Sequence, residues 1–364
     1  MEDNAAHALE GLVLKDKWKV IRKLTPGASA TGGFFSVSYI VSDGENEAFL
    51  KALNFKAFFS LFKGKSVIEI LNEQTNAYKY EKELLVRCRN NKLSKVSMIL
   101  DEGEEFVEGY TISNVPYLIF EMAEGDIRSK ISFNNAIESV WKLRSLHNVA
   151  VGLKQLHYIN IGHQDLKPSN VLLYNNSFTS KIGDLGRSLC SEIAAPHENG
   201  GNFAGDFTYA PPEFLYKYIE PEWDKRVKAT DMYLFGSLIV FYYTGTNMTA
   251  SIGKNIDPAF RWGSWGGSFE DVKDYLIEGF YKSLKEFKNS IHREELGLEL
   301  YNIVEICCFP YPNKRGHPKS FNRQFSNQYD FDRIISKLDI LIRQEEYNIN
   351  HGSYIRNKGT KSNS

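Results

Sequence analysis

The chain has 364 residues, a formal net charge of −1, and a composition that is 42% hydrophobic and 13% aromatic. This is the composition of a globular protein with enough apolar side chains for a full core, in two lobes or domains. The near-balanced charge argues against nucleic acid or a membrane surface as the main partner. The cysteines, Cys88, Cys190, Cys307 and Cys308, lack metal-ligand or disulfide spacing, so we expect reduced thiols in a cytoplasmic protein.

The first third of the chain predicts a sheet and one long helix. Apolar and polar residues alternate in segments bounded by turn residues, which is the pattern of half-buried strands. The expected strands span residues 18–25, 34–41, 47–55, 96–100 and 117–122. Asp43-Gly44 is a hairpin signal between two of these strands. Residues 68–89 have apolar side chains at helical spacing, which predicts the helix.

After Gly125, helical periodicity dominates the chain. The expected helices span residues 136–158, 229–244, 269–289, 296–307 and 330–347. The two patterns together predict a bilobal α+β fold, with a small antiparallel β lobe carrying one major helix and a larger, mainly helical lobe. The expected divisions are an N-terminal extension at 1–13, the small lobe at 14–121, the larger lobe at 122–345 and a flexible polar tail at 346–364.

One stretch carries most of the chemistry, the run His-Gln-Asp-Leu-Lys-Pro-Ser-Asn at residues 163–170. It places Asp165, Lys167 and Asn170 close together, and Asp184 follows in a Gly-Asp-Leu-Gly turn. This set suits metal-assisted phosphoryl transfer, in which one carboxylate aligns the attacking hydroxyl. The second carboxylate and the amide oxygen are hard ligands for Mg²⁺, and the lysine offers positive charge to the moving phosphoryl group.

With these motifs, the chain resembles the eukaryotic-type (Hanks-type) Ser/Thr protein kinase superfamily over roughly residues 14–345. The resemblance implies a protein substrate, with ATP and Mg²⁺ (or Mn²⁺) as cofactors. It makes Asp165 the catalytic base or hydroxyl-orienting residue, Lys167 the phosphate-stabilising residue, and Asn170 and Asp184 the metal ligands.

In the small lobe, Lys51 resembles the strand lysine that contacts the α- and β-phosphates, with Lys56 as its rival. The resemblance implies an ion-pair partner for this lysine on the long helix. Glu81 has the best spacing for that partner, and Glu73 and Glu83 are the alternatives.

Further nucleotide-site residues follow from the resemblance alone. They are Gly27, Ser29 and Gly32 in the phosphate loop, Phe120 as gatekeeper, Glu121 and Ala123 in the hinge, Asp126 near the ribose and Leu172 below the adenine. Ser29 stands where the family has a glycine, which restricts the loop backbone.

Phe49 stands on the face of Lys51 where the family has a small alanine, and Phe34 replaces the usual valine. These two aromatic rings would crowd the nucleotide or shift the adenine.

Two further matches are structural. Glu213, in Tyr-Ala-Pro-Pro-Glu at 209–213, resembles the glutamate that pairs with a buried arginine, for which Arg315 is the candidate. Asp231 resembles the helix aspartate that braces the catalytic loop.

Two departures concern regulation and the acceptor site. Gln164 replaces an arginine that usually reads a phosphate on the activation segment, so we expect activity that is independent of phosphorylation between Asp184 and Glu213. Asp206 stands in place of the usual threonine. Its carboxylate would be able to pair with Lys167, and it would also be able to repel Asp165 and raise a pKa.

The first hypothesis is therefore an active serine/threonine protein kinase. A pseudokinase acting as a scaffold or allosteric nucleotide binder is the alternative, and Ser29, Phe34 and Phe49 favour it. A small-molecule kinase is the third hypothesis, and the Lys-Pro pair at 167–168 argues against it.

Overall fold

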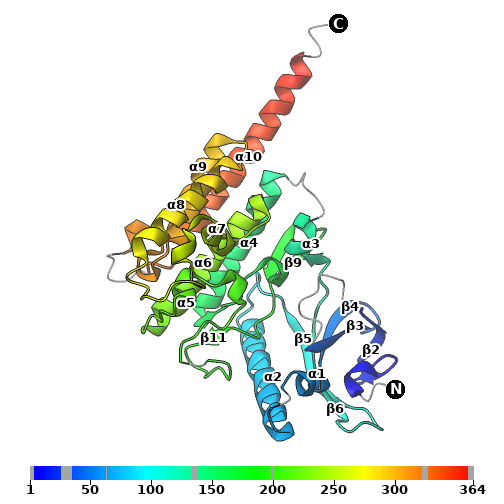
Figure 1. Cartoon of the computed structure of the whole chain (residues 1–364). Helices are drawn as coiled ribbons and strands as arrows, with labels where there is room; N and C mark the ends of the chain where they lie inside the picture. The colour runs from blue at the N-terminus through cyan, green and yellow to red at the C-terminus, as the bar shows by residue number, and fades with distance from the viewer. Residues whose placement is uncertain are drawn as a thin grey trace. The chain divides into compact units, whose positions relative to one another are not determined.

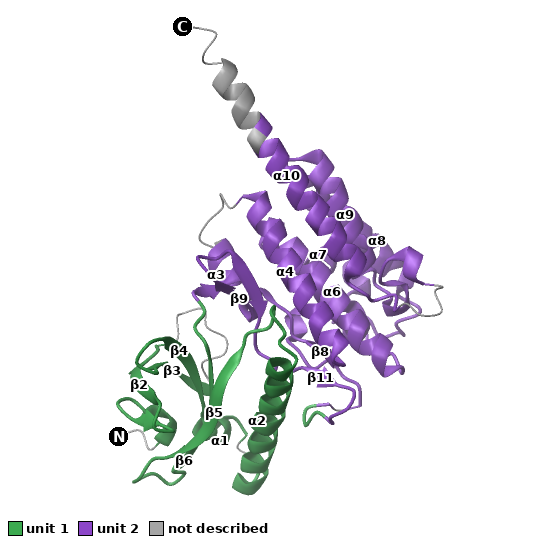
Figure 2. Ribbon diagram, turned by 180° about the vertical axis from the view of Figure 1, so that it is seen from behind, with its two compact units in different colours: residues 1–123, 195–197 green, residues 124–194, 198–364 purple. Residues whose placement is uncertain are grey.

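The structure is a computed structural model that describes residues 4–25, 35–62, 64–132, 138–198, 200–321 and 327–359. The chain forms two compact units, coloured separately in Figure 2. Unit 1 comprises residues 1–123 and 195–197, and unit 2 comprises residues 124–194 and 198–364. A small antiparallel sheet with one long helix lies in unit 1 and most helices lie in unit 2, so the predicted bilobal α+β fold is confirmed.

Unit 1 is built on a six-stranded antiparallel sheet with strand order β1-β2-β3-β4-β6-β5 (Figure 1). The strands are β1 Val13–Leu14, β2 Trp18–Lys23, β3 Ser36–Ser42, β4 Glu47–Leu53, β5 Ile99–Phe106 and β6 Asn114–Glu121. The β3–β4 hairpin closes at Asp43, whose Oδ1 accepts the backbone N–H groups of Glu45 and Asn46. Gly44 has a φ of 99°, a conformation that glycine adopts without strain.

Alternation along β4 separates the two faces of this sheet. Ala48, Leu50 and Ala52 are fully buried in the core of unit 1, whereas Phe49 and Lys51 lie on the opposite, partly open face. The N-terminal segment covers the core face: Ala5, Ala6 and Leu9 belong to the same cluster of buried residues. Three residues of the segment expected as an N-terminal extension therefore belong to the core of unit 1.

Two helices connect the strands of unit 1, α1 Phe55–Leu61 and α2 Val67–Asn90. Helix α2 begins with a capping box, in which Ser66 Oγ accepts from Glu69 N and Glu69 accepts from Ser66 N. Its Tyr78 hydroxyl lies 3.1 Å from the backbone oxygens of Gly103 and Tyr117. This contact joins α2 to strands β5 and β6. The sequence predicted α2 but not α1.

Unit 2 is mainly helical. Its helices are α3 Ile127–Ser132, α4 Ser139–Tyr158, α5 Pro212–Leu215, α6 Trp223–Thr244, α7 Met248–Asn255, α8 Lys273–Asn289, α9 Glu294–Cys308 and α10 Asp332–Gly359. Helix α6 is buried along most of its length and ends at Gly245, which has a φ of 73°. Helix α9 packs on α6, and α10 packs on α4 (Figure 1). In the described part of the chain, no helix is long and apolar enough to cross a membrane.

Short strands in unit 2 support its loops. These are β7 Gly125–Asp126, β8 Ile161–Gly162, β9 Val171–Tyr174, β10 Thr179–Ile182 and β11 Leu189–Cys190. Strands β7, β9 and β10 form one small sheet, and β8 pairs with β11. Helix α10 continues to Gly359, and the flexible polar tail expected from residue 346 stays a prediction. Leu341, Ile342 and Glu345 are buried, and a helix fixed by packing propagates at low cost into the polar residues that follow.

Candidate active site

Asp231 of α6 anchors the loop at residues 163–170. Its carboxylate is fully buried and accepts the backbone N–H groups of His163 and Gln164, each at 2.8 Å. The His157 ring nitrogen Nε2 lies 2.8 Å from the same carboxylate. Because α6 is itself buried, these contacts fix the loop to the rigid centre of unit 2. Asp231 therefore makes the bracing contact that the sequence suggested.

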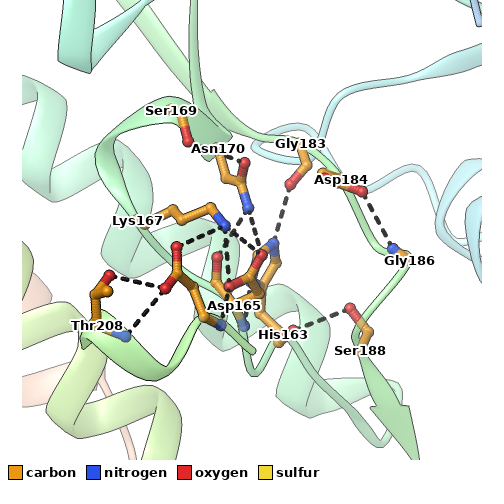
Figure 3. Close-up of polar contacts among 11 residues, drawn as sticks. His163, Asp165, Lys167, Ser169, Asn170, Gly183, Asp184, Gly186, Ser188 and Thr208 are labelled. Atoms are coloured by element: carbon orange, nitrogen blue, oxygen red, sulfur yellow. Dashed lines mark hydrogen bonds and ion pairs between the residues drawn. The ribbon is translucent and has the colours of Figure 1, made fainter. Parts of the chain in front are cut away.

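The carboxylate of Asp165 is held in one orientation by several donors (Figure 3). Oδ1 accepts the backbone N–H of Asp206 at 2.8 Å, and Oδ2 lies 3.2 Å from Asn170 Nδ2 and 3.0 Å from Lys167 Nζ. The contact with Asp206 requires a glycine before it, since a Cβ on Gly205 would lie 2.3 Å from the Gln164 backbone oxygen. A carboxylate fixed in this way suits an aligned proton acceptor.

Asp206 and Lys167 form an ion pair, with 3.5 Å between Oδ2 and Nζ. Burial lowers the pKa of Lys167, but the carboxylates of Asp165 and Asp206 outweigh burial and raise that pKa above its ordinary value. Burial raises the pKa of Asp206, but hydrogen bonds from Thr208 and the charge of Lys167 bring it below its ordinary value. The expected pairing of Asp206 with Lys167 is therefore formed.

Asn170 and Asp184 present the oxygen atoms expected of metal ligands. The Asn170 amide nitrogen lies 2.8 Å from the Asp165 backbone oxygen, which leaves the amide oxygen facing away from Asp165 (Figure 3). Asp184 has a φ of 59°, which is uncommon for a residue with a side chain and often marks a functional site. The turn is tied to the catalytic loop, since His163 Nε2 lies 3.0 Å from the Gly183 backbone oxygen. A carboxylate and an amide oxygen fit Mg²⁺.

In unit 1, Lys51 and Glu81 form the ion pair expected from the sequence. Lys51 Nζ lies 2.9 Å and 3.2 Å from the two carboxylate oxygens of Glu81, a largely buried residue of α2. Of the two alternatives, Glu73 pairs with Lys65, and Glu83 is exposed. The rival lysine, Lys56, is exposed on α1.

Phe49 shares the face of Lys51, as strand alternation predicted. It lies opposite Phe120 in the β4–β6 register, with 6.5 Å between the ring centroids. The two rings therefore form an aromatic surface beside the Lys51–Glu81 pair. Gly27, Ser29, Gly32 and Phe34 lie outside the described residues.

The remaining residues of the expected nucleotide site have structural contacts of their own. Glu121 accepts the Met98 backbone N–H at 2.8 Å, and Ala123 is the last residue of the main part of unit 1. Asp126 accepts the Ser129 backbone N–H at 2.7 Å and so caps α3. Asp126 also lies opposite Leu172 in the β7–β9 pair. Contact of Asp126 with a ribose stays a prediction.

Glu213 and Arg315 form the buried pair that the sequence suggested. The two guanidinium nitrogens lie 2.7 Å and 2.6 Å from the two carboxylate oxygens, and Arg315 is fully buried. Arg315 also donates to the backbone oxygens of Ala229, Phe309 and Pro310. The charge is therefore fully compensated where water is excluded.

Sequence reasoning missed one ion pair of the activation segment. Glu198 Oε1 lies 3.1 Å from a guanidinium nitrogen of Arg226 on α6, and Arg226 also donates to the Glu220 backbone oxygen at 3.0 Å. Neither residue stands in a periodic pattern or a motif. Residues 192–207 contain no serine, threonine or tyrosine. This was the signal in the sequence that the segment is held by something other than a phosphate.

Comparison with known proteins agrees with this geometry. A sequence model of the protein kinase domain matches residues 63–315, and the chain therefore belongs to the protein kinase family. It is similar to a probable LRR receptor-like serine/threonine-protein kinase of Arabidopsis thaliana, 28% identical over 61% of this chain and 24% of the relative. It is also similar to the serine/threonine-protein kinase BRI1-like 1 of Arabidopsis thaliana, 25% identical over 78% of this chain and 21% of the relative.

Mitogen-activated protein kinase 4 of Rattus norvegicus is 26% identical over 57% of this chain and 74% of that protein. The chain spans about a quarter or less of the first plant relatives, whose lengths it covers by 24%, 15% and 21%.

Proposed function

We propose that this protein kinase transfers the γ-phosphoryl group of ATP to serine or threonine hydroxyls of protein substrates. The orientation of Asp165 carries the proposal: its carboxylate is fixed by Asp206 N, Asn170 Nδ2 and Lys167 Nζ. Asp165 orients the acceptor hydroxyl and accepts its proton, and Lys167 stabilises charge on the transferred group. Asn170 and Asp184 would hold Mg²⁺ or Mn²⁺, which supplies neutralisation of phosphate charge.

In the proposed function, residues of unit 1 bind the nucleotide. Lys51, oriented by Glu81, would bind the nucleotide phosphates, and Phe120, Glu121 and Ala123 would face the adenine. The lobe boundary near residue 122 stays part of the proposal.

Serine/threonine specificity rests on the catalytic loop and on the relatives. The Lys-Pro pair at residues 167–168 is the form found in the serine/threonine branch, and the tyrosine branch usually has arginine or alanine in place of this lysine. Two of the relatives above carry the description serine/threonine-protein kinase. We also propose a cytoplasmic location, because the four cysteines are buried and their spacing gives no disulfide framework.

Independence from activation-segment phosphorylation has three supports. Gln164 is uncharged, and its buried amide donates to the Val227 backbone oxygen at 2.9 Å and to Asp231 at 3.0 Å. Residues 192–207 contain no serine, threonine or tyrosine. The Glu198–Arg226 ion pair already joins the segment to α6 without a phosphate.

Labelled-phosphate transfer from ATP to the chain itself and to a generic protein tests the proposed activity. Asp165→Ala and Asp184→Asn are each expected to lower transfer by at least about 10³-fold, since each removes a group that acts in the transition state. Glu278→Gln, on the exposed face of α8, is the matched control and is expected to leave transfer unchanged. Transfer that survives both active-site substitutions would contradict the catalytic assignment.

A pseudokinase that binds nucleotide without transfer is the second candidate, and the Phe49–Phe120 aromatic surface beside Lys51 favours it. A thermal-shift measurement with ATP and Mg²⁺ separates the candidates when combined with the transfer assay. Stabilisation by ATP without transfer would support the pseudokinase. The match to the protein kinase domain goes against the small-molecule kinase.

A further inference from the structure

Asp206 brings a second carboxylate to the acceptor site. Its backbone N–H donates to Asp165 Oδ1 at 2.8 Å, so the two aspartates lie side by side. The Asp165 side chain is 9% exposed, whereas that of Asp206 is 33% exposed. The Asp206 carboxylate is therefore the more open of the two to a substrate chain.

The position of this carboxylate is fixed. Asp206 Oδ1 accepts the Thr208 backbone N–H at 3.0 Å and the Thr208 hydroxyl at 2.7 Å. The second oxygen, Oδ2, has only a long contact of 3.5 Å to Lys167 Nζ among the contacts described, and Lys167 is closer to Asp165, at 3.0 Å. One cation is thus shared between two carboxylates. Figure 3 shows the donors that surround Asp165 and the two bonds made by Thr208.

Asp165 and Asp206 share Lys167, and the contact of Lys167 with Asp206 is the longer of the two. Arg128 adds a positive charge that acts on the Tyr209 phenol, together with the charges of Asp206, Lys167 and Asp165. The Asp206 backbone N–H, however, donates to the Asp165 carboxylate. Any hydroxyl that reaches Asp165 must therefore come close to Asp206. Consecutive Cα atoms are about 3.8 Å apart, so residues one or two positions from the acceptor pass within reach of Asp206.

We propose that Asp206 selects protein substrates that carry arginine or lysine within two residues of the acceptor hydroxyl. This inference rests on the proposed protein kinase function. A partly exposed carboxylate attracts a basic neighbour and repels an acidic one, and like-charge contact is an effective way to reject a wrong partner. The competing interpretation is that Asp206 only restrains Lys167, in which case its removal would change transfer to every substrate by the same factor.

The test compares matched peptides that differ only beside one serine, with arginine, alanine or glutamate as neighbours. The wild-type protein is expected to have a kcat/KM at least about 10-fold higher for the arginine peptide than for the glutamate peptide. Asp206→Asn removes the charge and keeps an oxygen for Thr208, and it is expected to reduce this ratio to about 2-fold or less. Asp206→Glu retains the charge and is expected to retain the preference.

Glu278→Gln, which removes a remote surface charge, is expected to keep the wild-type ratio. An unchanged ratio in Asp206→Asn, or an equal change for all peptides, would overturn the proposal. Binding of the same labelled peptides is measured in parallel by fluorescence anisotropy. Absence of transfer by the wild type would contradict the kinase proposal alone, whereas equal affinity for the arginine and glutamate peptides would overturn the role of Asp206.

Discussion

Arg315 and Glu213 form a doubly hydrogen-bonded ion pair with side chains that are 0% and 3% exposed. They are far apart in the sequence, and the pair joins the end of the activation segment to the loop after α9. The guanidinium also donates to the backbone oxygens of Ala229 and Pro310. Removal of either partner would therefore leave the other buried and unpaired.

Arg315→Met is expected to destabilise the protein by roughly 3–5 kcal/mol, because it leaves Glu213 buried and unpaired. A urea titration followed by tryptophan fluorescence measures the loss. Arg343→Met breaks an exposed ion pair with Asp339 on α10 and is the matched control, with an expected cost below about 1 kcal/mol. Equal unfolding midpoints for the two variants would show that the buried pair contributes no more than a surface pair.

Phosphatase treatment is expected to leave kinase activity unchanged within about twofold, because Gln164 has no charge with which to read a phosphate. Ser191→Ala is expected to behave like the wild type, since Ser191 is the hydroxyl residue nearest to the hydroxyl-free stretch on its N-terminal side. The measurement is initial rate on a generic protein before and after treatment. Loss of activity on treatment, reproduced by one substitution between Asp184 and Glu213, would refute phosphorylation independence.

Arg226→Met is expected to lower kcat by about tenfold, because the activation segment loses its anchor to α6. Lys225→Met is the control, because it changes the adjacent residue, whose ion pair with Glu222 lies on the surface. This variant is expected to have almost no effect on kcat. Steady-state kinetics with saturating ATP and protein substrate measures both. The double variant Glu198→Arg with Arg226→Glu is expected to recover part of the loss, and a further loss instead would show that the pair is not the anchor.

Phe49→Ala is expected to lower the KM for ATP severalfold, since it removes a ring from the face that carries Lys51 and Phe120. The thermal shift produced by ATP and Mg²⁺ is expected to increase in parallel. Phe106→Ala, at an exposed position of β5, is the control for loss of a phenylalanine. A higher KM for the Phe49 variant would show that this ring contributes to nucleotide binding and does not crowd it.

The sequence predicted the fold and the candidate site best where the residues concerned are close together in the chain. Asp165, Lys167 and Asn170 occupy one short loop, so residue type and spacing sufficed to predict that they lie together. Helix α2 was predictable because its apolar spacing and its capping box at Ser66 are both local signals.

Contacts between distant segments were much harder to predict. Helix α1 is capped by Asn54, whose side-chain oxygen accepts the Ala57 backbone N–H and also accepts from Asn4 Nδ2, at 2.9 Å. That position depends on a segment 50 residues away, which no periodic pattern reports. The Glu198–Arg226 pair likewise joins a loop to a helix across 28 residues. Only the folded chain brings such partners together.

The burial of Ala5, Ala6, Leu9 and Leu14 affects the choice of N-terminal boundary for a recombinant protein. Tyr39 donates its hydroxyl to the Ala6 backbone oxygen at 2.7 Å, and Leu9 and Leu14 are fully buried against the sheet. The family match starts only at residue 63. Expression boundaries taken from that match, or from the first long strand at Trp18, would remove one wall of the hydrophobic core and leave an apolar sheet face open to aggregation. A recombinant form that is to keep this part of the core has to include Ala5 and the residues that follow it.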